Sequence, residues 1–132
     1  MDFLINTPFK LNLNVIELDE HLPSMKLFFD LDTSNMKNEL KHIGEIWMET
    51  KEYDNFLASL GKKNSIKSEF NSIDNNFNLI LSKENNEFFI TLNIRSIGVF
   101  ETSIIQSHIR FKLNDSEYSN IVEEFEKLKI YI

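Results

Sequence analysis

The sequence predicts an α+β domain in which about six to seven mostly antiparallel strands pack with two amphipathic helices. Short runs of alternating apolar and polar residues, two stretches with helical spacing, and turn residues between them favour this class. A chain of 132 residues is the size of one domain, so we expect residues 1–132 to share a single core. The hydrophobic fraction of 42%, with twelve phenylalanines, supplies the apolar material for that core.

The first half of the chain predicts three strands. Residues 9–15 and 25–31 alternate between apolar and polar side chains, which is typical of half-buried strands, and the segment 19–24 contains a proline and indicates a turn. We therefore expect the two strands to be antiparallel neighbours. The polar segment 33–39 predicts a loop, and residues 40–48 predict a further strand with mixed faces.

Signals at both ends predict a helix over residues 50–60. Thr50 can cap the first backbone amides, and Gly61 suits the left-handed position after the last turn. Between them lies an apolar stripe at helical spacing, formed by Tyr53, Phe56, Leu57 and Leu60.

The second half predicts four more strands and a final helix. The strands are expected at residues 66–70, 77–81, 88–94 and 105–113. Asn85 and Asn86 tolerate positive φ and predict a tight turn between the second and third of these, and a connection follows at residues 96–103. A helix over about 115–129, capped by Asp115 or Ser116, presents an apolar stripe of Tyr118, Ile121, Val122, Phe125 and Leu128.

Charge and composition limit the classes of partner and the cellular location that we expect for this chain. The net charge is −7, of which −6 lies in residues 1–60 and −1 in residues 61–132. A field of this sign disfavours nucleic acid and anionic lipid as partners and favours a basic protein, although mild acidity is also common in soluble domains. The chain has no cysteine, no secretory signal and no apolar run of membrane-spanning length, so we expect a cytoplasmic protein.

Motifs for catalysis, metals or cofactors are not found. His21, His42 and His108 are far apart, so their spacing predicts no metal site. Ser107 and His108 are adjacent on a predicted strand and must point to opposite faces. The three glycines are isolated, so no phosphate-binding loop and no cofactor is predicted.

Asp30 and Asp32 form the one enzyme-like pair, since they lie two apart on a predicted strand and so share a face. Two carboxylates could hold a cation or divide acid and base roles, but a solvated outer face explains them as well. The acidic run at residues 123–126 is likewise expected on the polar side of the last helix. Trp47 is interpreted as a core residue or as an anchor of an interface.

The order of elements resembles a known family. The resemblance covers about the last 85 residues, and its members are the WapI-type immunity proteins of bacterial contact-dependent and polymorphic toxin systems. It is carried by Ile46-Trp47-Met48, Tyr53-x-x-Phe56-Leu57-x-x-Leu60, Asn76-Phe77-Asn78-Leu79, Phe88-Phe89-Ile90-Thr91-Leu92 and Ile109-Arg110-Phe111-Lys112-Leu113-Asn114-Asp115-x-x-Tyr118-x-x-Ile121.

The resemblance implies a cytoplasmic, non-enzymatic protein that binds and neutralises one cognate toxin domain. Many such toxins are nucleases with basic clefts, and acidity in the first half suits such a partner. The predicted toxin-binding residues are Asp19, Glu20, Asp30 and Asp32, followed by Glu45, Glu49 and Glu52. Two alternatives stay open: a small-molecule or peptide-binding module using the space between sheet and helix, and an enzyme working through Asp30 and Asp32.

Overall fold

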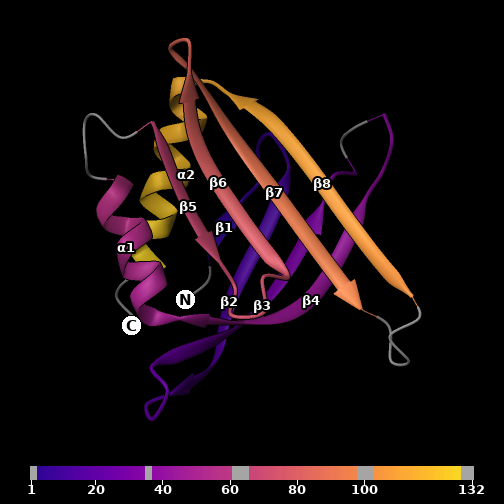
Figure 1. Cartoon of the computed structure of the whole chain (residues 1–132). Helices are drawn as coiled ribbons and strands as arrows, with labels where there is room; N and C mark the ends of the chain where they lie inside the picture. The colour runs from indigo at the N-terminus through magenta and orange to yellow at the C-terminus, as the bar shows by residue number, and fades with distance from the viewer. Residues whose placement is uncertain (1–2, 35–36, 61–65, 98–102, 129–132) are drawn as a thin grey trace.

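The computed structural model describes residues 3–34, 37–60, 66–97 and 103–128, which form eight strands and two helices (Figure 1). The α+β prediction is confirmed, with one strand more than the upper expectation and with two sheets rather than one. The elements are β1 (Phe3–Ile5), β2 (Lys10–Asp19), β3 (Ser24–Asp32), β4 (Lys41–Glu49), α1 (Thr50–Leu60), β5 (Lys67–Asn71), β6 (Phe77–Glu84), β7 (Glu87–Ile97), β8 (Ile104–Leu113) and α2 (Asp115–Leu128).

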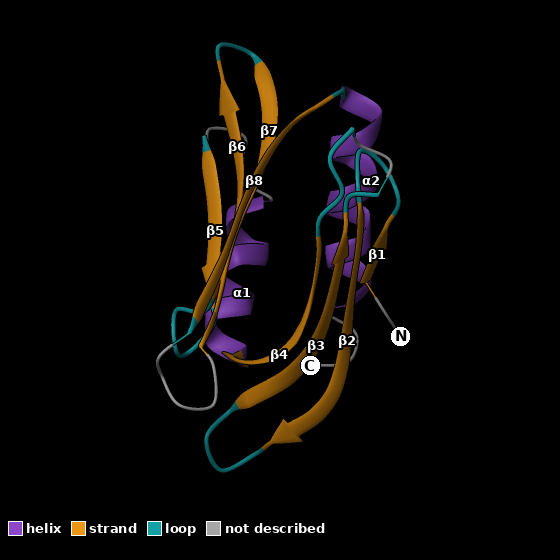
Figure 2. Ribbon diagram, turned by 90° about the vertical axis from the view of Figure 1, so that its right-hand side faces the viewer, coloured by secondary structure: helices purple, strands orange, loops and turns teal. Residues whose placement is uncertain are grey.

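Each sheet is an antiparallel meander of four consecutive strands, β1 to β4 in one and β5 to β8 in the other. The sheets form two layers (Figure 2), and alternate residues of every long strand face the space between them. Phe29 of β3 meets Phe77 of β6 with ring centroids 5.2 Å apart, and Phe9 meets Phe111 of β8 at 4.9 Å. The core is therefore a sheet-on-sheet interior of the kind that buries one face of each sheet.

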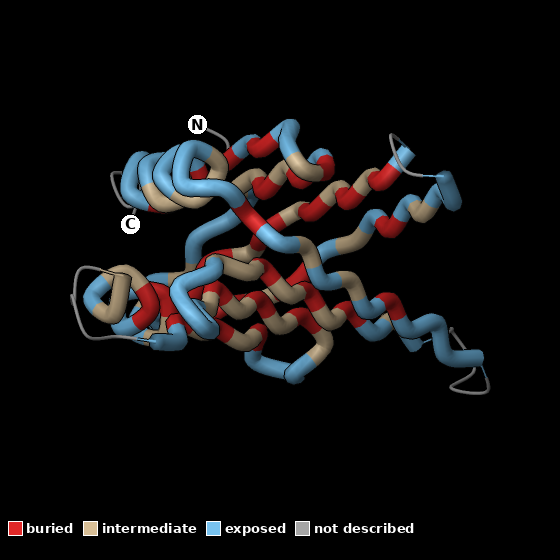
Figure 3. The backbone as a smooth tube through the Cα atoms, turned by 90° about the horizontal axis from the view of Figure 1, so that it is seen from above, coloured by how far each residue is buried: buried red, intermediate tan, exposed pale blue. Residues whose placement is uncertain are grey.

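An aromatic cluster closes one flank of the sandwich, where both helices lie (Figure 1). Phe125 of α2 stacks on Phe3 of β1 at 4.2 Å and meets Phe56 of α1 at 4.9 Å, edge to face. The Tyr53 hydroxyl donates to the Phe125 carbonyl at 2.6 Å, and burial raises the pKa of this hydroxyl. Along the strands of both layers, buried residues alternate with half-buried or exposed ones (Figure 3). This packing joins both helices to the two sheets around one core.

The architecture repeats. Four antiparallel strands followed by a helix occur twice, and the short first strand of each half packs against the helix of the other half, β5 on α1 and β1 on α2. The helices share a short pattern at the same position, Glu52-Tyr53-x-Asn55 and Glu117-Tyr118-x-Asn120. The sequence does not reveal this repeat, because three shared residues per helix are too few to stand out against ordinary amphipathic patterning.

The helix boundaries agree with the prediction, but the capping residues differ. Among the described residues no helix amide donates to the Thr50 side chain, and its hydroxyl donates to the Pro23 carbonyl at 3.2 Å. Asn114, and neither Asp115 nor Ser116, caps α2: its side-chain oxygen accepts from the Glu117 amide at 2.7 Å, and the Glu117 carboxylate accepts from the Asn114 amide at 3.0 Å. Gly61 and residue 129, predicted near the helix ends, lie outside the described residues.

The turn and strand predictions hold with two additions. Asn85 and Asn86 have φ of 52° and 65°, so the predicted tight turn joins β6 to β7. The 33–39 loop is observed in its described part, while most of the expected 96–103 connection lies outside it. The sequence did not predict β1, since three residues are too few for alternation to be visible. Nor did it predict that β2 continues to Asp19 past an irregularity at Ile16.

Candidate functional site

The outer side of the first sheet carries the acidic residues of the first half. Residues that point away from the core on β2, β3 and β4 lie in rows across the strands, so charges distant in sequence become neighbours. We call this surface the outer acidic face, and its carboxylates and lysines are Glu17, Asp19, Asp30, Asp32, Glu45, Glu49, Lys10, Lys26 and Lys41. Six acids against three lysines give it a net charge of −3.

A β-bulge decides which residues of β2 join this face. The register shifts between Val15 and Glu17, so that Glu17 pairs with Lys26 and Asp19 with Ser24. If Ile16 continued the regular alternation in place of forming the bulge, Leu18 would point outward and Asp19 inward. The bulge therefore aligns Asp19 with Asp30 and Asp32, which the alternating pattern alone does not reveal.

Apolar side chains occupy the middle of the outer acidic face. Phe28 and Trp47 are half-buried and Ile43 is 46% exposed. The Lys26 ammonium lies 5.9 Å from the Trp47 ring centroid and 3.0 Å from the Glu45 carboxylate, which places charge directly beside the aromatic surface. Aromatic and aliphatic groups surrounded by charges are the usual composition of a protein-binding surface. Trp47 is thus half-buried on the outer face and does not belong to the core between the sheets.

Asp30 pairs across the strands with Asn12, and each presents an enclosed side-chain oxygen. Oδ1 of Asp30 and Oδ1 of Asn12 accept no hydrogen bond within the described part of the chain. An enclosed acceptor without a donor costs free energy, about 1–3 kcal/mol for a buried group.

Asp19 and Asp32 have local structural roles as well. Asp19 Oδ1 accepts from the amides of His21 at 2.9 Å and Leu22 at 3.2 Å, closing the β2–β3 turn. The Ser34 amide donates to Asp32 Oδ1 at 2.8 Å, and this hydrogen bond, aided by the Ser34 hydroxyl and by Lys41 and Lys10, lowers the pKa of Asp32. Both carboxylates are thereby held in fixed positions on the face.

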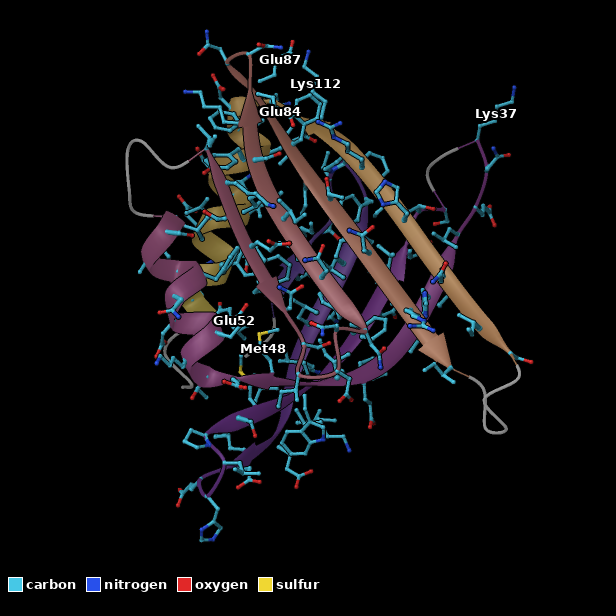
Figure 4. All side chains as sticks on the ribbon, in the orientation of Figure 1. Lys37, Met48, Glu52, Glu84, Glu87 and Lys112 are labelled. Carbon is cyan, nitrogen blue, oxygen red and sulfur yellow. The ribbon has the colours of Figure 1, made fainter. Side chains whose placement is uncertain are left out.

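Of the remaining predicted residues, some lie on the outer acidic face and others lie beside it. Glu49 lies at the end of the outer acidic face, where it and Glu52 line a hollow of about 280 Å³ with residues 71–73 and Asn75. Glu52 (labelled in Figure 4) belongs to α1, and its Oε1 accepts from the Asn71 amide at 3.3 Å, so it borders the face without belonging to it. Glu20 lies in the exposed β2–β3 turn. The structure thus gathers five of the seven predicted residues on one sheet face.

The outer face of the second sheet has a different chemistry. A row of side-chain amides crosses it, with Asn78 Nδ2 donating to Asn71 Oδ1 at 2.8 Å and Asn93 Nδ2 to Asn78 Oδ1 at 2.9 Å, and His108 completes the row through Asn93. Because these side chains are hydrogen-bonded to one another, the row leaves fewer free donors and acceptors for a partner than the outer acidic face does.

A serine–histidine contact occurs inside the core. His42 Nδ1 lies 2.8 Å from Ser107 Oγ and His42 Nε2 lies 2.8 Å from Ser96 Oγ, so the imidazole joins the two sheets. His42 is 7% exposed and Ser107 6%, which leaves no room for a substrate at the hydroxyl. Ser107 and His108 do point to opposite faces, as predicted. The contact is structural.

The described residues contain no group of three or more histidine, aspartate or glutamate side chains that could hold a metal ion. Comparisons with protein-family models, with curated proteins and with solved structures found no match for this chain. Within the described part of the chain, neither helix is long and apolar enough to cross a membrane. The outer acidic face is therefore the candidate site on its geometry alone.

Proposed function

We propose that this chain is an immunity protein: it binds a basic toxin domain through the outer acidic face and neutralises it without catalysis. The observation that carries the proposal is the arrangement of six carboxylates around Phe28, Ile43 and Trp47 on one exposed sheet face. The resemblance to WapI-type immunity proteins supplies the class of partner and a cytoplasmic location. The negative charge of the face indicates that the binding surface of the partner is basic.

The face combines the two functions that a tight and specific complex requires. Its carboxylates attract a basic surface and speed up encounter, whereas the aromatic centre excludes water and contributes most of the affinity once contact is made. Asp30 adds a carboxylate beside Ile43 in the middle of the face. A basic cleft that normally holds nucleic acid offers cations that can pair with the carboxylates of this face.

The test begins with capture of the partner from lysate of the protein's own cells, washed at low and at high salt and identified by mass spectrometry. The captured segment is then produced alone, and its toxicity is measured with and without co-expression of this protein. A basic segment bound in stoichiometric amount, whose toxicity is relieved by co-expression, is the expected result. Capture without relief of toxicity would contradict the immunity function while leaving the binding face standing.

We predict that Asp30→Lys with Asp32→Lys weakens partner binding about tenfold or more and flattens its salt dependence, because both attraction and the position facing Asn12 are lost. Titration calorimetry at two salt concentrations measures both effects. The matched control is Glu123→Lys with Glu126→Lys on the exposed side of α2, which changes the net charge equally. Equal losses in the two double variants would show that only total charge matters, and the outer acidic face would be rejected.

A further inference from the structure

A groove runs along the free edge of the second sheet. It has a volume of about 450 Å³ and lies between β8 and the loop that joins β3 to β4. Its lining comprises Thr33, Lys37, Asn38, Leu40, Ile109, Arg110, Phe111 and Lys112. Lys37 and Lys112 come from the two sides of this groove (Figure 4).

The lining shows that the groove follows the edge of β8 and not one of its faces. Successive side chains of a strand point to opposite faces, so a hollow over one face is lined by every second residue. Here four consecutive residues, 109–112, line the same hollow. Only a groove alongside the strand meets all four. β8 is the last strand of its sheet and pairs with β7 alone among the described strands, so every second backbone group along it points toward this groove.

The walls of the groove are apolar at the base and cationic at the rim. Leu40, Ile109 and Phe111 are half-buried and form the apolar base. Three hydrogen bonds between Thr33 and Leu40 close the loop that forms the wall opposite β8, and in one of them the Thr33 amide donates to the Leu40 carbonyl at 2.9 Å. The charged lining residues are all cations, Lys37, Arg110 and Lys112. Their sign is opposite to that of the outer acidic face.

The rim cations are available to a ligand. The Arg110 guanidinium lies 4.2 Å from the Phe89 ring centroid of β7 and pairs with Glu84, and Lys112 pairs with Glu87 at 2.8 Å, so both side chains lean over β7. These ion pairs are exposed at the surface and contribute at most about 1 kcal/mol each, so the side chains can turn to an incoming carboxylate at the strand edge. Lys37 has no carboxylate within ion-pair distance in the part of the chain that the structure describes.

We propose that this groove binds an extended, acidic segment of another protein, which adds to the second sheet as a ninth strand beside β8. Backbone hydrogen bonds to the open edge would hold the segment, its apolar side chains would meet Ile109 and Phe111, and its carboxylates would meet the three cations. A second copy of this chain fits less well, because the edge strand of a copy would bring His108, Arg110 and Lys112 against their own counterparts. This surface is separate from the outer acidic face, so either proposal can fail alone.

The probe is a fluorescein-labelled ten-residue peptide of alternating glutamate and valine, and the same peptide with lysine in place of glutamate is its control. Fluorescence anisotropy should show saturable binding of the acidic peptide only. Lys37→Glu with Lys112→Glu should weaken this binding about fivefold or more. The matched pair Lys10→Glu with Lys51→Glu, which lies outside the groove, should leave specific binding in place.

Two readouts separate strand addition from simple charge attraction. A peptide methylated on alternate backbone nitrogens should lose binding, because it cannot form the ladder. Amide hydrogen exchange along residues 104–113 should slow with the peptide at every second residue, those whose amides point away from β7. Binding that survives N-methylation, slowing without this alternation, or no saturable binding of the acidic peptide would each overturn the proposal.

Discussion

The imidazole of His42 joins the two sheets from within the core, and its protonation state matters there. Burial lowers the pKa of His42 below the value of 6.5 for a free histidine, because the charged form would lose its hydration between the sheets. A neutral imidazole also suits its two neighbours, since one ring nitrogen donates and the other accepts, and the hydroxyls of Ser96 and Ser107 can adopt the complementary roles.

We therefore predict that the free energy of unfolding decreases as the pH falls from about 6.5 toward the lower pKa of folded His42. In that interval the unfolded chain binds the proton more readily than the folded protein does, so lower pH favours unfolding; above the interval both forms are neutral and the contribution is constant. Urea titrations at pH 7.5 and 5.5 measure the change. In His42→Gln, which keeps the polar contacts but does not titrate, the decrease should largely disappear, and its persistence would assign it to other groups.

Gly44 leaves space for the ring of Phe29 on the neighbouring strand. A Cβ at position 44 would lie 2.8 Å from Phe29 Cζ and 3.0 Å from Cε1. Gly44→Ala should therefore destabilise the protein by about 1–2 kcal/mol, the cost of overpacking minus the gain from replacing glycine in a strand. Denaturant unfolding measures this loss. In the Phe29→Leu background the same change should cost less, and equal costs in both backgrounds would show that the ring is not the obstacle.

The reciprocal cap between Asn114 and Glu117 sets the start of α2. Asn114→Ala removes the acceptor for the Glu117 amide and should lower the free energy of unfolding by about 1 kcal/mol. Ser116→Ala, at a position that the sequence also offered as a cap, is the control and should have little effect. Thermal unfolding of both variants compares them directly. A larger loss in Ser116→Ala than in Asn114→Ala would contradict the observed cap.

Local patterns predicted most elements, and pairing between distant strands explains what they missed. The stripe from Tyr53 to Leu60 and the two asparagines before Glu87 act within a few residues, so the sequence shows them. The division into two sheets and the contact of His42 with Ser107 depend on partners more than 60 residues away or on the opposite layer, whereas β1 is too short to show alternation. For the candidate site, alternation predicted that Asp30 and Asp32 share a face. The aromatic centre and the place of Asp19 required the register of three strands and a bulge.

In each half of the chain, the helix packs mainly on the first strand of the other half, and this arrangement predicts how the whole chain folds. Each helix finds its main strand contact in the other half, so a half alone leaves an aromatic face uncovered. We expect that fragments 1–63 and 64–132 do not fold separately but co-purify as a folded pair when produced together. Circular dichroism of each fragment and affinity purification through a tag on one of them measure this. A single fragment that is folded and monomeric would contradict it.

The stacking of Phe3 on Phe125 also has a consequence for synthesis of the protein. These two rings, 4.2 Å apart in the folded chain, come from the first strand and the last helix. While the ribosome is still making the second half, β1 has no helix to cover it, and the first sheet must wait with its apolar side open. Because α2 follows all eight strands in the sequence, Phe125 can cover Phe3 only after the whole second half has been synthesised. The core of the first sheet is therefore completed late in synthesis, after both sheets have been made.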